Sequence, residues 1–266
     1  MIKLNGKPIN LTVFPDKTTQ VWKLDLSAVH REFSNVVDWD FESESEIMHL
    51  VQLKTLLDHE LVVTSLVLSY LPYARQDKPV SNDAMFGLAS FAKIINSLNF
   101  ERVEIMDPHS TVAKIIDRNY FRYPTRQLES VLIGTDLNIG AVHFLDYGVR
   151  GKYSQHYVYG TSAPIPKGMS VFYGAKTCDQ ATGNLSGYSI VSDSYGGSKN
   201  VSGLNVLIID NICDDETPFC IAAKALYEQG AKSVSLFVTH GLFTKGTQPL
   251  RDAGIKNIFT KDGEAA

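Results

Sequence analysis

The chain carries the stretch Tyr70-Leu71-Pro72-Tyr73-Ala74-Arg75-Gln76-Asp77-Lys78 shortly after the apolar run 61–68. This run is dense in Val and Leu and predicts a fully buried strand. The residues that follow it form a rigid Pro-Tyr turn and present a guanidinium, an amide, a carboxylate and an ammonium. An open α/β sheet places its ligand site at the carboxyl ends of its strands, and these groups suit a nucleotide. The alternative is an ordinary turn with solvated charges.

Apolar runs alternate with helix-like segments over most of the chain, which predicts βαβ units and mainly parallel sheets. The polar segment 123–126 is the expected boundary between two α/β halves, and the Gly- and Ser-rich segment 183–203 predicts a mobile loop or hairpin beside the site. The first forty residues fit strand and loop equally well. We expect strands at 102–106, 141–145, 205–209 and 233–238, and helices at 83–98 and 218–229, the second with Pro218 in its first turn and Gly230 as its stop.

The composition describes an ordinary globular protein. The 266 residues are 44% hydrophobic and 20% charged, and the net charge of −4 with no basic run argues against nucleic-acid binding. No run approaches membrane-spanning length, so we expect no membrane partner. The cysteines Cys178, Cys213 and Cys220 form no CxxC pair, which indicates free thiols in a reducing cytosol. The expected location is the cytoplasm of a bacterium or of a phage-infected host.

The segment Pro72–Lys78 closely resembles the ATP-binding signature of the ribose-phosphate pyrophosphokinases, or phosphoribosyl pyrophosphate (PRPP) synthetases. Met106-Asp107-Pro108-His109, the acidic strand end 208–215 and the Thr-His-Gly segment at 239–241 follow in the family's order. The resemblance implies an α/β chain of two phosphoribosyltransferase-like domains, each a mainly parallel sheet flanked by helices. They would be an ATP-binding domain at 1–124 and a ribose-acceptor domain at 125–266.

The reaction that the resemblance implies transfers the β,γ-diphosphate of ATP to the anomeric hydroxyl of a ribose and releases AMP. Such a transfer needs positioning and charge neutralisation rather than covalent catalysis, with Mg²⁺ bridging phosphate oxygens. Arg75, Gln76 and Asp77 would hold ATP, with Arg75 also catalytic. His109 would help to hold Mg-ATP and, like Arg75 and Lys176, would be catalytic. Alternatively, His109 is an ordinary loop residue held by hydrogen bonds.

The remaining site residues are also assigned by resemblance. Phe14 and Asp16 match an N-terminal element that reaches adenine from a neighbouring subunit, although Thr18 replaces the family's Glu. The ordinary metal ligand would be Asp146, in Asp146-Tyr147-Gly148, with His109 as an unusual one. Lys176 matches a lysine on the family's mobile catalytic loop, although a lone lysine is usually only a solubilising charge. The acceptor ribose would be held by Asp210, Asn211, Asp214, Asp215 and Thr217. An acidic cluster stabilised by a helix dipole is compatible with that role.

The acceptor loop departs from the family pattern. The family's Thr-Gly-Gly-Thr turn offers backbone N–H groups to a 5′-phosphate, whereas this chain has Asp215-Glu216-Thr217-Pro218, without glycine and with a proline that donates no N–H. A phosphate dianion near two carboxylates is opposed by roughly 1 kcal/mol or more per charge pair. We therefore favour ADP-ribose as acceptor, as in a phage-associated branch that makes ADP-ribose 1-pyrophosphate for NAD⁺ resynthesis, over ribose 5-phosphate.

Two other functions stay open. A non-catalytic protein that regulates PRPP synthetases is disfavoured because Arg75, Gln76, His109 and Asp146 are retained. A phosphoribosyltransferase that uses PRPP would share the acidic loop but would not need the ATP motif. Because the family shares its ATP site between subunits, a homo-oligomer, either a dimer or a hexamer, is expected.

Overall fold

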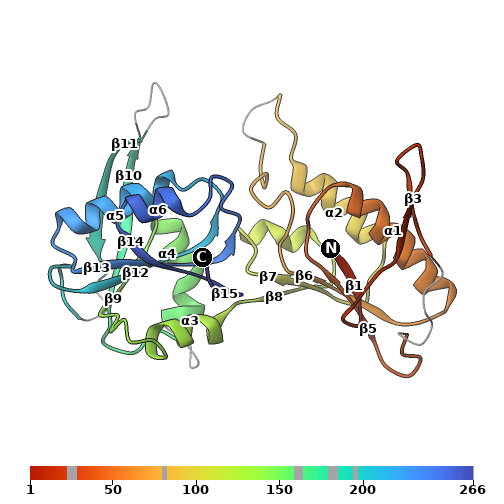
Figure 1. Cartoon of the computed structure of the whole chain (residues 1–266), viewed down its shortest axis with the longest axis horizontal. Coiled ribbons are helices and arrows are strands. Elements are labelled where there is room, and N and C mark those ends of the chain that lie inside the picture. The colour runs from red at the N-terminus through yellow and green to blue at the C-terminus, as the bar shows by residue number, and fades with distance from the viewer. Residues whose placement is uncertain (23–28, 80–82, 159–163, 179–184, 194–196, 266) are drawn as a thin grey trace. The chain divides into compact units, whose positions relative to one another are not determined.

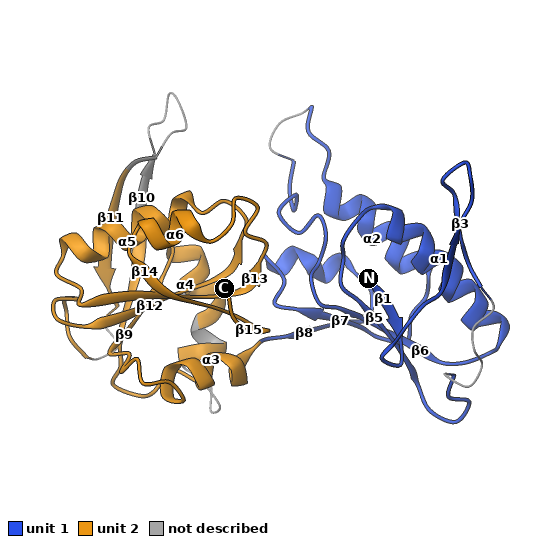
Figure 2. Cartoon of the chain, in the orientation of Figure 1, with its two compact units in different colours: residues 1–123 blue, residues 124–266 orange. Residues whose placement is uncertain are grey.

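The structure is a computed structural model that describes residues 1–22, 29–79, 83–158, 164–178, 185–193 and 197–265. The chain divides into two compact units, Met1–Tyr123 and Pro124–Ala266 (Figure 2). These ranges differ by one residue from the expected domains 1–124 and 125–266. Each unit is built around one mainly parallel sheet, as predicted.

The first unit contains a six-stranded sheet in the order β2-β1-β5-β6-β7-β8, in which β5 to β8 run parallel (Figure 1). A separate hairpin, β3-β4, belongs to the same unit. The elements are β1 (Ile2–Leu4), β2 (Lys7–Pro8), β3 (Leu11–Val13), β4 (Thr19–Val21), β5 (Asn35–Trp39), α1 (Ser45–His59), β6 (Thr64–Leu68), α2 (Gly87–Ser97), β7 (Val103–Met106), a 3₁₀ turn (Thr111–Ile115) and β8 (Asn119–Arg122).

The central strands of the first unit's sheet bury one face, and their other face is only half-buried. Side chains in β5, β6 and β7 alternate between buried and half-buried, and Leu66 and Leu68 are on the buried face. The expectation of a fully buried strand is therefore wrong, because Ser65 and Val67 of β6 are only half-buried. The physical reason is the connection order: successive right-handed crossovers in one direction place α1 and α2 on the same side of the sheet (Figure 1).

The predicted strand 61–68 begins only at Thr64, because the preceding residues end helix α1. Leu61 has a φ of +56°, and its N–H donates to the Asp58 carbonyl, while the Val62 N–H donates to the Leu57 carbonyl. These two bonds form a Schellman motif, whose left-handed position is usually glycine. The apolar run therefore serves two elements, and periodicity alone could not separate them.

The second unit contains a seven-stranded sheet in the order β11-β10-β9-β12-β13-β14-β15. The strands β10, β9, β12, β13 and β14 are parallel neighbours. The chain places β10 on one side of β9 and then adds β12, β13 and β14 on the other side. Figure 1 shows α5 and α6 on one side of this sheet and α3 on the other. The elements are α3 (Thr125–Ile133), β9 (Ala141–Phe144), α4 (Tyr147–Tyr153), a π turn (Ser154–Val158), β10 (Ser170–Cys178), β11 (Leu185–Ser192), β12 (Asn205–Cys213), α5 (Thr217–Glu228), β13 (Ser233–Gly241), α6 (Gln248–Asp252), β14 (Ile255–Thr260) and β15 (Gly263–Glu264).

Helix α5 agrees closely with its sequence prediction. It carries Pro218 in its first turn, and it ends in a Schellman motif at Gly230, whose φ is +87°. The predicted loop or hairpin at 183–203 includes β11, which pairs antiparallel with β10. Among the described residues, none of the helices has the length and apolarity that crossing a bilayer requires.

Replacing Leu61 by Gly is expected to stabilise the protein by about 1 kcal/mol, because glycine adopts the left-handed conformation without a Cβ penalty. The side chain is 91% exposed, so its removal costs little packing. The Leu61→Ala variant is the matched control, since it loses the same side chain but keeps the strained backbone. Urea unfolding measures both, and equal stabilities for the two variants would contradict this account.

Candidate active site

The loop after β6 is held in shape by its own aromatic residue. Tyr73 has a φ of +61° and accepts a turn hydrogen bond at its carbonyl from the Gln76 N–H at 2.9 Å. Its ring lies 5.6 Å from the ring of Phe91 in α2, and its hydroxyl donates to Glu44, which raises the pKa of Tyr73. This anchoring leaves Arg75 and Gln76 exposed at the carboxyl end of the strand.

Gln76 lies against the first residue of α2. The Gln76 carbonyl accepts from the Leu88 N–H at 3.2 Å, and a Cβ at Gly87 would stand 2.1 Å from the Gln76 side-chain oxygen. Gly87 therefore makes room for the amide group. Asp77, the third ATP-binding residue predicted in this loop, is half-buried, whereas Arg75 and Gln76 are exposed.

A second polar segment follows β7. Asp107 has a φ of +39°, is 1% exposed, and its N–H donates to the Arg122 carbonyl at 2.7 Å. Burial, together with the charge of Asp107, raises the pKa of Tyr123 to about 12. His109, two residues further on, is exposed. Since β6 and β7 are parallel neighbours, their carboxyl ends place the Arg75 and His109 segments at the same edge of the sheet.

Phe14 and Asp16 lie in the turn of the β3-β4 hairpin. The Asp16 carboxylate accepts hydrogen bonds from the Thr18 hydroxyl at 2.7 Å and from the Thr18 N–H at 3.0 Å, and these bonds lower the pKa of Asp16. Thr18 therefore has a local structural role at the position where the family carries Glu. The Phe14 side chain is 41% exposed.

In the second unit, Asp146 begins helix α4 at the carboxyl end of β9. Its carboxylate accepts from the Val149 N–H at 2.9 Å, as an N-cap does. The neighbouring Arg150 forms an ion pair with the buried Asp193 at 2.8 Å. The capping bond occupies part of the carboxylate that was predicted as a metal ligand.

The sequence prediction missed a pair formed by the buried His143 and the half-buried Tyr188 beneath the same strand end. The His143 Nε2 atom lies 2.7 Å from the Tyr188 hydroxyl, and that hydroxyl also donates to the Leu145 carbonyl at 3.1 Å. Burial, with smaller contributions from Asp146 and Asp210, raises the pKa of Tyr188. Two residues on separate strands carry no shared sequence pattern, so only the presence of a histidine in an apolar run could have drawn attention to this place.

Two predicted acceptor residues lie on a strand instead of in a loop. Strand β12 continues to Cys213, four residues past its expected end, so it includes Asp210 and Asn211. The Asn211 N–H donates to the Asp210 carboxylate at 2.7 Å, and Asn211 is 4% exposed. Pairing with β13 maintains the extended backbone.

The segment 214–217 makes hydrogen bonds to itself and to the loop that follows β13. The Asp215 carboxylate accepts from the Thr217 hydroxyl at 2.8 Å and from its N–H at 3.3 Å, and these bonds lower the pKa of Asp215. The Thr244 hydroxyl donates to the Asp214 carbonyl at 3.0 Å. Glu216 is 1% exposed, and its Oε2 atom has no hydrogen-bond partner among the described residues. At the start of α5 the Thr217 N–H is thus directed to the Asp215 carboxylate, Pro218 has no N–H, and the Phe219 N–H donates to the Glu216 carbonyl at 3.1 Å.

Lys176 lies in strand β10, opposite Tyr188 in β11. The resemblance places this lysine on a loop, but its backbone lies in a strand. The reason is that antiparallel pairing with β11 extends β10 to Cys178. Its side chain lies outside the described part of the structure.

In the described part of the chain, the predicted metal ligands do not form a cluster with other such side chains. No group of three or more His, Cys, Asp or Glu side chains that could hold a metal occurs among the described residues. Mg²⁺ is commonly held by one or two carboxylates plus substrate phosphates. His109 is in the first unit and Asp146 is in the second.

Comparisons with known proteins point to one class of enzyme. The chain is 27% identical over 186 residues to a ribose-phosphate pyrophosphokinase of Agrobacterium fabrum, which covers 68% of this chain and 54% of that protein. It is 28% identical over 209 residues to the enzyme of that name from Mesorhizobium japonicum, covering 74% and 61%. The chain thus spans little more than half the length of these relatives. No protein-family model matches.

A solved structure is similar over nearly the whole chain. The phosphoribosylpyrophosphate synthetase of Mycobacterium smegmatis superimposes with a TM-score of 0.74 at 18% identity, covering 95% of this chain and 79% of that one. The predicted fold, two phosphoribosyltransferase-like units with mainly parallel sheets, is confirmed.

The buried His143 predicts a dependence of stability on pH. Burial lowers the pKa of His143 to about 3, whereas an unfolded histidine titrates near 6.5. Between these values the unfolded chain binds a proton that the folded protein does not, so stability falls as the pH falls through this window. The loss approaches about 1.4 kcal/mol per pH unit.

We expect His143→Gln to flatten the pH dependence of urea unfolding between these two pKa values. Tyr188→Phe is the control: it removes a hydrogen bond and lowers stability at every pH, but it retains the histidine and the slope. A His143→Gln variant with the unchanged slope would refute the assignment.

Proposed function

We propose, from the premise that this chain is a divergent member of the ribose-phosphate pyrophosphokinase family, that it transfers the β,γ-diphosphate of ATP to the anomeric hydroxyl of a ribose and releases AMP. The observation that carries this proposal is the loop of Tyr73 to Asp77. Its backbone is anchored by Tyr73, and its Arg75 and Gln76 side chains are exposed at the carboxyl end of a central parallel strand.

Within the first unit, the ATP site would combine two neighbouring strand ends. Arg75 offers a planar guanidinium for stacking and paired hydrogen bonds, and Gln76 offers an amide to the base. His109, at the next strand end, would contact the phosphates of Mg-ATP. Phe14 and Asp16, in the hairpin turn, would act on the nucleotide of a neighbouring subunit.

Within the second unit, Asp210, Asn211 and Asp214 would hold the ribose hydroxyls, with Asp215 and Thr217 beside them. Carboxylates are strong acceptors for hydroxyl donors. Lys176 would approach the transferred group, where a donor aimed at developing charge contributes about 3 kcal/mol. Magnesium enters this scheme with ATP, and Asp146 offers one carboxylate to it.

The acceptor has two candidates. Ribose 5-phosphate is the acceptor implied by the name of the relatives, and those comparisons give ADP-ribose no support. The segment 214–217 favours ADP-ribose, because the Thr217 N–H is directed to Asp215, Pro218 has no N–H, and Glu216 is buried beside them. A phosphate monoester gains few donors there, whereas a diphosphate diester carries less charge per phosphate.

AMP release with Mg-ATP and each acceptor tests the reaction and the acceptor together. We expect release to depend on a ribose acceptor and to be faster with ADP-ribose. A clear preference for ribose 5-phosphate contradicts the acceptor and leaves the reaction intact. If neither acceptor stimulates release while the protein binds a second PRPP synthetase in a pull-down, the non-catalytic regulatory function replaces the enzyme.

A homo-oligomer is the expected assembly. One face of the first unit's sheet stays half-buried, and burial raises the pKa of Asp38 on that face, so part of this surface is already poorly solvated. A second copy of the chain would cover it. Sedimentation would distinguish dimer from hexamer.

The Gly87→Ala variant tests the position of Gln76. Its added methyl displaces the Gln76 amide, a flexible group, so folding stability should change little. We expect the KM for Mg-ATP to rise about fivefold, the loss of roughly one hydrogen bond, with the KM for the acceptor unchanged. Gly151→Ala, which meets no atom within 4 Å, is the control. An unchanged KM for ATP would remove Gln76 from the proposed site.

A further inference from the structure

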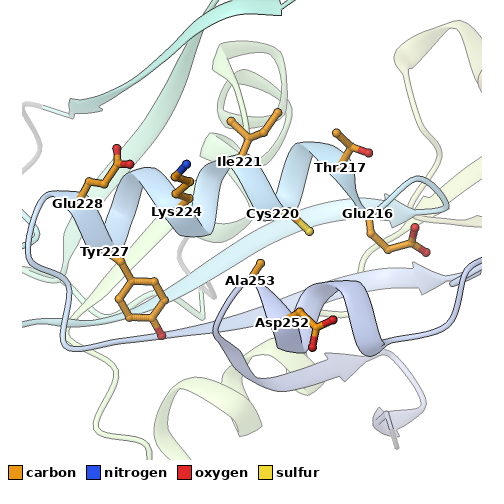
Figure 3. A pocket seen from close by; sticks show the side chains of 9 residues that line it. All are labelled: Glu216, Thr217, Cys220, Ile221, Lys224, Tyr227, Glu228, Asp252 and Ala253. Atoms are coloured by element: carbon orange, nitrogen blue, oxygen red, sulfur yellow. The ribbon is translucent and has the colours of Figure 1, made fainter.

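A pocket of about 750 Å³ lies between α5 and α6, along the side of the second unit. Figure 3 shows the arrangement: Cys220 points from α5 towards α6, Asp252 and Ala253 lie at the end of α6, and Glu216 and Glu228 stand near opposite ends of α5. The volume is in the usual range for small-molecule sites. The pocket touches the proposed acceptor segment only at Glu216 and Thr217.

The lining combines an apolar floor with an excess of negative charge. Ile221, Ala253 and the ring of Tyr227 supply apolar surface, and the Tyr227 hydroxyl is already engaged with the Gly254 carbonyl at 2.7 Å. The charged side chains that line the pocket are three acids and one base: Glu216, Glu228, Asp252 and Lys224. Glu216 is the only buried one of these four.

The acidic side chains affect the thiol of Cys220, which lines the pocket. Burial raises the pKa of the Cys220 thiol, and the charges of Glu216, Asp215 and Asp252 raise it further. Among the residues that line the pocket, three acids thus face a single ammonium, that of Lys224. The buried Glu216 carboxyl, with its Oε2 atom unpartnered among the described residues, adds a charge that is little screened by water.

We propose that the pocket between α5 and α6 is a binding site for a small organic cation, an apolar body with an ammonium or amidinium group. The apolar floor would hold the body, Asp252 would face the cationic group, and Glu216 and Glu228, near the two ends of α5, would add to the negative field. An anion of the same size would meet three carboxylates and one ammonium. This site borders the proposed acceptor segment at Glu216 and Thr217, but binding of a cation there does not depend on the proposed reaction.

Cys220 provides a reporter inside the pocket. The folded protein is labelled with the cationic trimethylammonium-ethyl and the anionic sulfonatoethyl methanethiosulfonates, and mass spectrometry follows the peptide that carries Cys220. Rates are normalised to the same reagents reacting with a small free thiol. We expect the cationic reagent to be favoured by about fivefold or more at low salt, and this preference to shrink as salt is added.

Substitutions in the pocket lining test whether its charges cause the preference for the cationic reagent. The double change Asp252→Asn with Glu228→Gln should abolish most of it, whereas Lys224→Gln should increase it. Asp262→Asn, an exposed acid outside the pocket, is the matched control and should leave it unchanged. The rate with neutral methyl methanethiosulfonate shows whether each variant keeps the pocket intact.

Reversible occupancy is tested with benzylammonium, which should slow labelling of Cys220 by the neutral reagent in a saturable way, whereas benzoate should not. Equal normalised rates for the cationic and anionic reagents would overturn the proposal. So would protection by benzoate equal to that by benzylammonium, or no protection by either at millimolar concentrations. None of these measurements requires catalysis, so the site stands or fails independently of AMP release.

Discussion

Parallel strand pairing is the constraint on which the rest of this protein depends. In each unit the parallel strands place their carboxyl ends at one edge of the sheet, so segments far apart in sequence become neighbours there. In the first unit this brings the loop after β6 next to the segment after β7. In the second unit it brings the ends of β9 and β12 together, with Asp146 following one and Asp210 on the other.

The loops at these edges are supported by contacts from below. Tyr73 fixes the first loop through Phe91 and Glu44, and Gly87 leaves space for Gln76. In the second unit the Tyr188 hydroxyl bridges His143 and the Leu145 carbonyl, and a Cβ at Gly174 would lie 2.2 Å from that hydroxyl. Functional side chains placed on such supported backbones lose less conformational freedom when a substrate binds.

The segment 214–217 shows how a helix start can lose its affinity for phosphate. A helix N-terminus usually offers free N–H groups to an anion. Here Asp215 accepts the Thr217 N–H, Pro218 has none, and the buried Glu216 adds negative charge. The same Glu216 forms one end of the acidic pocket between α5 and α6, so one departure from the family pattern affects both places.

The sequence by itself determined the fold class, the βαβ order, the ends of α5 and the family resemblance, because these depend on local periodicity, capping residues and a contiguous motif. Only the tertiary structure decided that the run 61–68 starts in the C-terminal cap of α1 and becomes a strand at Thr64, that β6 buries one face, and that Asp210 and Lys176 are on strands. The His143–Tyr188 pair and the pocket at Cys220 were also invisible in the sequence. The reason is physical: burial, hydrogen-bond partners and local potential arise from residues distant in the chain, and only folding brings them together.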